Sequence, residues 1–210
     1  MARFFNAITN GLTPCKRVSL LILLALLSGS CSHTLERQTC VALAKDVSYC
    51  LAPIPADSQV RSVTQRVTIE VDDSSHELLT QLELDSGQLT LVGLAPLGQA
   101  LFTILFDGVS LNSQQNMLLG DEFKAEYLLA LIQLIYWPQA DVNAHLQGAR
   151  LTSPECDAPR CRTIYATVND TKDNRRKSII KISFDKIEPW QAEVELAIPQ
   201  AKFELKITPI

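Results

Sequence analysis

The sequence predicts an α+β protein in which a single curved antiparallel sheet wraps around one main apolar helix. Three observations lead to this prediction. Hydrophobic and polar residues alternate over several segments, as they do in strands with one buried face. A helical pattern near residues 121–136 separates two groups of such segments. That helix is apolar on nearly all sides, so it needs cover from more than one direction.

The first group of predicted strands precedes the helix. It covers residues 66–71, 78–84, 89–94 and 101–106. In the first two strands polar and apolar residues alternate, which indicates one buried and one wet face. In the last two strands both faces are apolar. Such strands are covered on both sides, or one side meets an apolar partner.

The predicted helix begins at Asp121, a good N-cap residue, and ends near Tyr136, two residues before Pro138. Its polar residues, Lys124 apart, fall in one narrow arc of the helical wheel: Glu122, Glu126 and Gln133. Two interpretations remain open. The helix is either a fully buried core helix, or it is half-covered and its other flank faces a lipid-like ligand.

A second group of alternating segments follows the helix. It covers residues 163–168, 180–184, 193–198 and 202–207, with turns between them. Each segment has one apolar face, which is typical of antiparallel strands that are wet on one side. Together the two groups predict a sheet of roughly eight to ten strands.

Residues 1–30 have the layout of a secretory signal peptide. Three basic residues precede an apolar run from Val18 to Leu27, and small residues follow it. The run of about ten residues is too short to span a bilayer, which needs roughly 20. Cys31, directly after the small residues, resembles the lipobox cysteine of bacterial lipoproteins, which carries acyl chains such as palmitate.

A lipidated Cys31 implies an anchor in a membrane, with a plain cleaved signal as the alternative. Ser32 follows the anchor where an aspartate would retain such a protein at the inner membrane, so we expect the periplasmic face of the outer membrane. Residues 31–62 lack sustained periodicity apart from a hint of a short strand at residues 49–51. We interpret residues 31–62 as a lipidated tether and entry segment that lead into a lipid-carrier-like half-barrel domain at residues 63–210.

The charge of the chain excludes nucleic acid as a partner. Removal of residues 1–30 takes away three of 19 basic residues, so 16 basic and 23 acidic residues remain and the formal charge is 16 − 23 = −7. An acidic chain without a basic cluster repels phosphate backbones.

Four cysteines follow Cys31, and an even number in an exported chain predicts disulfides. Four cysteines allow three pairings. Short separation in the sequence favours Cys40 with Cys50 and Cys156 with Cys161. Metal binding is the rival interpretation, but these spacings match no common zinc motif.

The sequence lacks catalytic motifs, and we expect neither an enzyme nor a cofactor or metal. It contains no G-x-S-x-G elbow and no glycine-rich phosphate loop. His76 and Glu77 begin like a zinc-protease helix, but Thr80 stands where the second histidine belongs. An enzyme that acts on lipids would need a polar residue beside an apolar pocket, for which Tyr127 and Asp121 are candidates.

Two segments carry a resemblance to a known family. GLAPLGQALFTILFDG (Gly93 to Gly108) and EYLLALIQLIYWP (Glu126 to Pro138) resemble a family of uncharacterised bacterial outer-membrane lipoproteins, often encoded beside aryl-polyene biosynthesis genes. More remotely, the order of strands, helix and strands is similar to that of the lipoprotein carrier LolA and its outer-membrane receptor LolB. The resemblance implies a half-open β-barrel that holds acyl chains around a helix.

The resemblance implies an outer-membrane-anchored lipoprotein that binds or transfers lipid-like cargo, acyl or aryl-polyene, in an apolar cavity. The alternative is a non-catalytic interaction or scaffold lipoprotein with protein partners in an envelope assembly. Apolar residues of the last strand before the helix and of the helix itself are the predicted lining: Leu101, Phe102, Ile104, Phe106, Tyr127, Leu128, Leu131, Ile135 and Trp137.

Overall fold

The structure, a computed structural model, describes residues 35–37, 39–85, 87–119, 123–167 and 177–210. The chain divides into two units, Met1–His33 and Thr34–Ile210, and all described residues belong to the second. The predicted signal peptide, Cys31 and the predicted N-cap Asp121 lie outside the described residues.

One antiparallel sheet of eleven strands forms most of the domain. Its strands follow the order β1-β8-β7-β6-β5-β4-β14-β13-β12-β11-β10, so that β1 and β10 are two separate edges and the sheet is not closed. The strands are β1 (Leu35–Arg37), β4 (Arg61–Val71), β5 (Ser74–Asp85), β6 (Gln88–Leu94), β7 (Ala100–Phe106), β8 (Leu111–Gln115), β10 (Ala149–Thr152), β11 (Arg160–Ala166), β12 (Ser178–Phe184), β13 (Val194–Ile198) and β14 (Phe203–Pro209).

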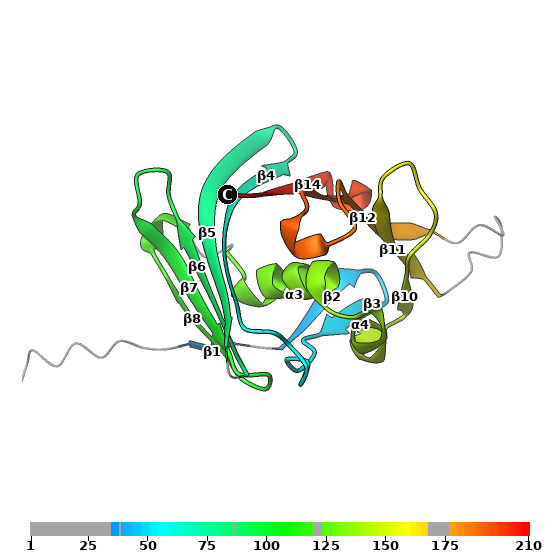
Figure 1. The fold of residues 1–210 in the computed structure, drawn as a ribbon, viewed down its shortest axis with the longest axis horizontal. Coiled ribbons are helices and arrows are strands. Elements are labelled where there is room, and N and C mark those ends of the chain that lie inside the picture. Colours follow the sequence, from blue (N-terminus) through cyan, green and yellow to red (C-terminus); the bar gives the residue numbers. More distant parts are fainter. Residues whose placement is uncertain (1–34, 38, 86, 120–122, 168–176) are drawn as a thin grey trace, which may run out of the picture. The chain divides into compact units, whose positions relative to one another are not determined.

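The sheet bends around one helix, α3 (Ala125–Tyr136), as Figure 1 shows. Two shorter elements accompany it, α4 (Gln139–His145) and the 3₁₀ turn η2 (Pro189–Gln191), with η1 (Met117–Leu119) and η3 (Pro199–Ala201) elsewhere. This architecture confirms the predicted α+β class with a curved antiparallel sheet around one main helix. The helix ends at Tyr136 as predicted, but it begins at Ala125 instead of Asp121.

The longest hairpin follows directly from the sequence pattern. Strands β4 and β5 pair over their full length, and a two-residue turn at Asp72 and Asp73 joins them. Asp72 has a φ of 51°, a left-handed conformation that aspartate tolerates in such turns. Their alternating residues therefore place one apolar face inside the curve of the sheet.

A second, three-stranded sheet was not expected from the sequence beyond the hint at residues 49–51. It has the order β2-β3-β9 and comprises β2 (Cys40–Ala44), β3 (Val47–Cys50) and β9 (Leu146–Gln147). Its buried residues include Val41, Val47 and Tyr49, which belong to the same core as α3. The β2–β3 hairpin, which lies within the predicted tether and entry segment, thus packs into the core of the domain.

Both disulfides that short sequence separation favours are present. Cys40–Cys50 links β2 to β3, where the two residues are register partners. Cys156–Cys161 closes a short loop that enters β11. The first bond ties the N-terminal hairpin together, and the second ties the loop between β10 and β11.

Candidate functional site

The main candidate site is a cavity of about 770 Å³ between α3 and the inner face of the sheet. We call it the α3 cavity. Its volume lies within the range typical of small-molecule sites. Apolar side chains dominate its wall, chiefly from β4, β5, β14 and α3: Val67, Ile69, Val71, Leu78, Leu91, Leu101, Phe102, Leu119, Phe123, Tyr127, Leu128, Leu131, Ile132, Phe203, Leu205 and Ile207.

Strand register arranges the sheet side of this wall in rows. On β4, Val71, Ile69, Val67 and Gln65 follow one another on the inner face, and each has a partner on β14. Exposure falls along this line, from 38% for Val71 to 5% for Val67 and 3% for Gln65. Six residues of strand span about 20 Å. The cavity is therefore long, with an open end near Val71 and a closed end near Gln65.

The helix supplies the opposite wall. Tyr127, Leu128, Leu131 and Ile132 line the cavity, and their spacing of three and four residues places them on one face of α3. Tyr127 and Leu128, at the beginning of the helix, are only partly buried. The side chains nearest the open end thus have apolar surface that the protein itself does not cover.

Two aromatic rings form the side wall beside β6 and β7. Phe102 stacks on Phe123 with 4.8 Å between the ring centroids. The Phe102 ring lies flat over Gly93, its register partner on β6, where a Cβ atom would come within 2.2 Å of the ring. Only glycine at this position permits the ring to lie there, because any side chain would displace it.

A second pair of rings lies next to Gln65, outside the lining of the cavity. Tyr136 at the end of α3 stacks on Trp190 of η2, with 4.0 Å between the centroids, and the guanidinium of Arg61 lies 5.0 Å from the Trp190 ring. Gln65 Nε2 donates a hydrogen bond of 2.9 Å to the Tyr136 hydroxyl. Burial raises the pKa of Tyr136 to about 12, so this hydroxyl is neutral at physiological pH.

The polar lining residues near the open end are exposed. Ser75, His76, Glu77 and Lys124 all line the cavity and all lie at the surface. The buried polar lining residues, Gln65 and Thr80, are neutral. The interior of the cavity is thus uncharged, and its charges lie at the mouth.

Buried polar bonds hold α3 in place on its other side. Arg162 on β11 donates hydrogen bonds of 2.7, 2.7 and 2.6 Å to the backbone oxygens of Leu134, Ile135 and Trp137. These carbonyls belong to the last turn of the helix, where a cation also complements the helix dipole. Burial lowers the pKa of Arg162 to about 10.

Gln133 forms a second buried attachment. Its side-chain oxygen accepts hydrogen bonds of 2.8 Å from both the Tyr49 hydroxyl and the Ala52 backbone nitrogen, and its amide nitrogen donates 2.9 Å to the Ala52 oxygen. Burial raises the pKa of Tyr49. Part of the polar arc of the helical wheel therefore faces the N-terminal hairpin, and the cavity lies on a different face.

The predicted lining residues divide into two groups. Five line the α3 cavity: Leu101, Phe102, Tyr127, Leu128 and Leu131. Four do not and instead lie in the packed core, each at most 2% exposed: Ile104, Phe106, Ile135 and Trp137. Of these four, Trp137 donates its indole proton to Pro53 O at 3.0 Å. Whether any of the nine contacts a ligand stays a prediction.

The residues of β4, β5 and β14 were missing from the predicted lining. Their alternation indicates a buried face but not what that face contacts. The signal that could have found them is the run of three successive apolar rows on β4 and β14, opposite a helix that needs cover.

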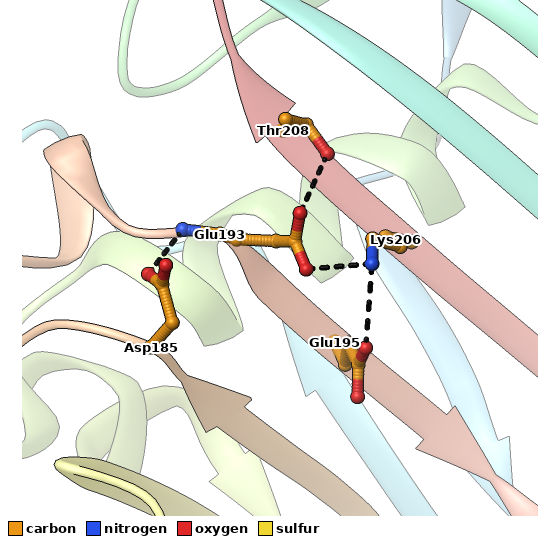
Figure 2. Close-up of polar contacts among 5 residues, drawn as sticks. All are labelled: Asp185, Glu193, Glu195, Lys206 and Thr208. Carbon is orange, nitrogen blue, oxygen red and sulfur yellow. Dashed lines mark hydrogen bonds and ion pairs between the residues drawn. The ribbon is translucent and has the colours of Figure 1, made fainter.

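A second hollow, of about 590 Å³, lies on the outer face of the sheet beside the Cys156–Cys161 loop. Charged side chains surround it, and the same face carries the cluster in Figure 2. Lys206 Nζ lies 2.6 Å from Glu193 Oε1 and 3.6 Å from Glu195 Oε1, and Asp185 accepts from the Glu193 backbone nitrogen at 2.6 Å. The hydrogen bond from Lys206 lowers the pKa of Glu193. This is a solvated face, unlike the α3 cavity.

Two further observations bear on the class of site. Among the described residues, no three histidine, cysteine, aspartate or glutamate side chains gather as metal ligands. Within the same part of the chain, no helix has the length and hydrophobicity needed to cross a membrane.

Comparisons with known proteins give one family and a distant structural likeness. The chain is similar to the crystal structure of a LolA superfamily protein from Nitrosomonas europaea, with 7% sequence identity and a TM-score of 0.38 over 73% of this chain and 85% of that one. No curated protein matches it significantly. The family described as a protein of unknown function, DUF3261, matches residues 62–210, which is well over half of the chain. The chain therefore belongs to the DUF3261 family.

Proposed function

We propose that this protein binds a lipid-like, elongated apolar molecule in the α3 cavity and carries or accepts it without chemical change. The observation that supports this proposal is the shape and lining of the cavity. It is long, it has one exposed end, and its interior is apolar and uncharged. Each methylene that leaves water for such a site contributes roughly 0.8 kcal/mol. An acyl chain fits this chemistry better than a charged or compact polar metabolite.

The partly covered beginning of α3 supports reversible binding. Tyr127 and Leu128 lie beside the open end, where the exposed side chains His76 and Lys124 surround the mouth. A guest with a polar head can keep that head in water while its chain lies along the strand rows. Release then needs no proton transfer and no bond cleavage.

The N-terminal region extends the proposal to location. We propose that Cys31 carries a lipid anchor that holds the protein at the periplasmic face of the outer membrane. The support is the signal-like sequence of residues 1–30 with a cysteine directly after its small residues. Labelling with radioactive palmitate and membrane fractionation test this part. Loss of label and of membrane association in Cys31→Ser is expected, and label that persists in that variant contradicts it.

Displacement of a fluorescent acyl probe, dansylaminoundecanoic acid, from the full chain tests the cavity. The expected result is saturable binding that hexadecanoic acid reverses. Leu131→Trp narrows the middle of the cavity and is expected to weaken binding about tenfold, the equivalent of two or so buried methylenes. The matched control is Leu105→Trp, because Leu105 is 37% exposed on the outer side of β7. Absence of probe binding, or equal weakening in both variants, refutes the proposed site.

A further inference from the structure

The closed end of the α3 cavity holds two polar side chains in an otherwise apolar interior. Gln65 on β4 and Thr80 on β5 are register partners, and both line the cavity. They are 3% and 5% exposed, whereas the neighbouring rows consist of Val67, Leu78 and Ile207. A cavity for a plain alkyl chain needs no hydrogen-bonding group at this depth.

The hydrogen bonds of Gln65 leave one atom unused. Its amide nitrogen donates to the Tyr136 hydroxyl at 2.9 Å, which fixes the orientation of the side chain. Within the described part of the chain, the Oε1 atom accepts no hydrogen bond, and it is not one of the fully buried polar atoms that lack a partner. Oε1 is therefore a free acceptor that is reachable from the cavity.

The Thr80 hydroxyl is nearly as available. Its bond to the Gln65 backbone oxygen is 3.5 Å long, which is beyond the usual range of an O–H···O hydrogen bond. Its oxygen retains lone pairs that can accept a proton from a guest. The two side chains thus present two acceptors at the same place, and neither carries a charge.

Two neutral acceptors in an apolar interior favour a neutral donor on the guest. An anion beside Gln65 and Thr80 would be repelled by their oxygen atoms. A cation would lose its hydration and find no negative charge in the cavity to compensate. A plain methyl end would leave the Gln65 oxygen unpaired, which costs about as much as a lost hydrogen bond. A hydroxyl donates its proton to the Gln65 oxygen and can accept the proton of the Thr80 hydroxyl, so it pairs with both side chains.

We propose that the guest of the α3 cavity carries a hydroxyl group at the chain end that reaches Gln65 and Thr80. The inference rests on the proposed binding of a lipid-like molecule, and it adds the chemistry of the buried end. Gln65 and Thr80 are the specificity-determining residues, and Tyr136 is a positioning residue that holds the Gln65 amide.

The test compares three chains of equal length on the wild-type full chain: ω-hydroxyhexadecanoic acid, hexadecanoic acid and hexadecanedioic acid. Each is titrated by displacement of the dansyl acyl probe at pH 8. The expected order places the ω-hydroxy acid about fivefold tighter than hexadecanoic acid, the value of one net hydrogen bond. The diacid is expected to bind more weakly than both, because its second carboxylate would face the two acceptors. Equal affinities for the first two acids overturn the inference.

Paired variants locate the preference. Gln65→Leu with Thr80→Val is expected to bind the two monoacids with equal affinity, because neither side-chain oxygen remains. The matched control is Thr64→Val with Gln81→Leu, the next register pair on the same strands, which points outward and joins its side chains by a hydrogen bond on the surface. This control is expected to retain the fivefold preference. Tyr136→Phe is expected to reduce the preference, measured as the ratio of the two monoacid affinities, because the Gln65 amide loses its acceptor.

The outcomes separate the two proposals. If neither monoacid binds wild-type protein, the proposed lipid-binding function fails, and this inference fails with it. If both bind equally, the function stands and the inference fails. The wild-type comparison requires no variant to fold, so it decides the question even if Gln65→Leu with Thr80→Val is unstable.

Discussion

The two sides of α3 differ in how they are covered. The side toward β2, β3 and the β10–β12 strands is close-packed, and Gln133 and Arg162 tie it to its neighbours. The side toward β4, β5 and β14 faces a hollow of about 770 Å³. Leu134, on the packed side, is fully buried, whereas Leu128, on the cavity side, is only partly buried.

This difference shows how one helix serves two purposes. The packed side contributes stability, and its polar bonds hold the end of the helix in one position. The cavity side leaves apolar surface uncovered, at a cost in stability that the packed side offsets, and this is the surface that we propose binds a guest. Substitutions on the two sides are therefore expected to separate stability from binding.

The largest effect on stability is expected at Arg162. Arg162→Met removes all three hydrogen bonds to the last turn of α3 and leaves those carbonyls buried without a partner, so it should lower the free energy of unfolding by about 4 kcal/mol. Urea unfolding followed by circular dichroism measures this. Arg160→Met, two residues along the same strand, is the control and should cost far less. Similar losses in both variants would contradict the role of Arg162.

A pair of alanine substitutions sharpens the contrast between the two sides. Leu134→Ala opens a void in packed core and should cost about 3 kcal/mol. Leu128→Ala only enlarges an existing hollow, so it should cost about 1 kcal/mol or less. Binding of the dansyl probe should show the reverse order, with weakening in Leu128→Ala alone. Equal costs in urea unfolding would mean that the cavity side is packed as tightly as the other.

Alkaline pH tests the buried hydroxyls at the two sides. Burial raises the pKa of Tyr136 to about 12, and it also raises that of Tyr49. In the unfolded chain tyrosine ionises near pH 10, so above this pH the unfolded state loses a proton that the folded state keeps. The free energy of unfolding should therefore be unaffected below about pH 10 and should fall as the pH rises toward about 12.

Urea unfolding at a series of pH values, with tyrosinate absorbance as the second signal, measures this fall. Tyr136→Phe, next to the cavity, should make the fall in the free energy of unfolding with pH less steep. Tyr49→Phe, on the packed side, should have the same effect. An unchanged slope in both variants would show that other groups cause it.

The smallest effect is expected on the outer face. Lys206→Met removes the ion pairs with Glu193 and Glu195, which are exposed and screened by solvent, so thermal unfolding should not change measurably. The pKa of Glu193 should rise toward its usual value, because the hydrogen bond from Lys206 lowers it in the wild type. Carboxyl titration by NMR measures this shift. A clear drop in melting temperature would mean that this face is structural.

Part of the site was predictable from the sequence. The alternating residues of β4, β5, β12, β13 and β14 predict their strands and their buried faces, because the period of two is a local property of a strand. The helix end before Pro138 is local in the same way. The sequence also predicts Leu128 and Leu131 at the cavity, because a helix that is apolar on nearly all sides needs cover from the strands around it.

Other features were beyond sequence reasoning for a physical reason. Ile104 and Ile135 have the same chemistry as Ile69, yet the first two lie in packed core and the third lines the hollow. Arg162 lies in an alternating strand, where its pattern predicts no contact with a helix end some 27 residues earlier. The alternation of β4 places Gln65 on the inner, otherwise apolar face. Only the tertiary structure shows that its side chain bonds to Tyr136 and lines the cavity.

The sequence by itself determined the α+β class, the order of strands, helix and strands, and the two disulfide pairs, because periodicity and short separations act locally along the chain. Only the tertiary structure decided which apolar residues fill the core and which surround a cavity. That decision depends on the distance between α3 and the sheet, which is set by Arg162, Gln133 and the Tyr136–Trp190 stack acting together across the fold.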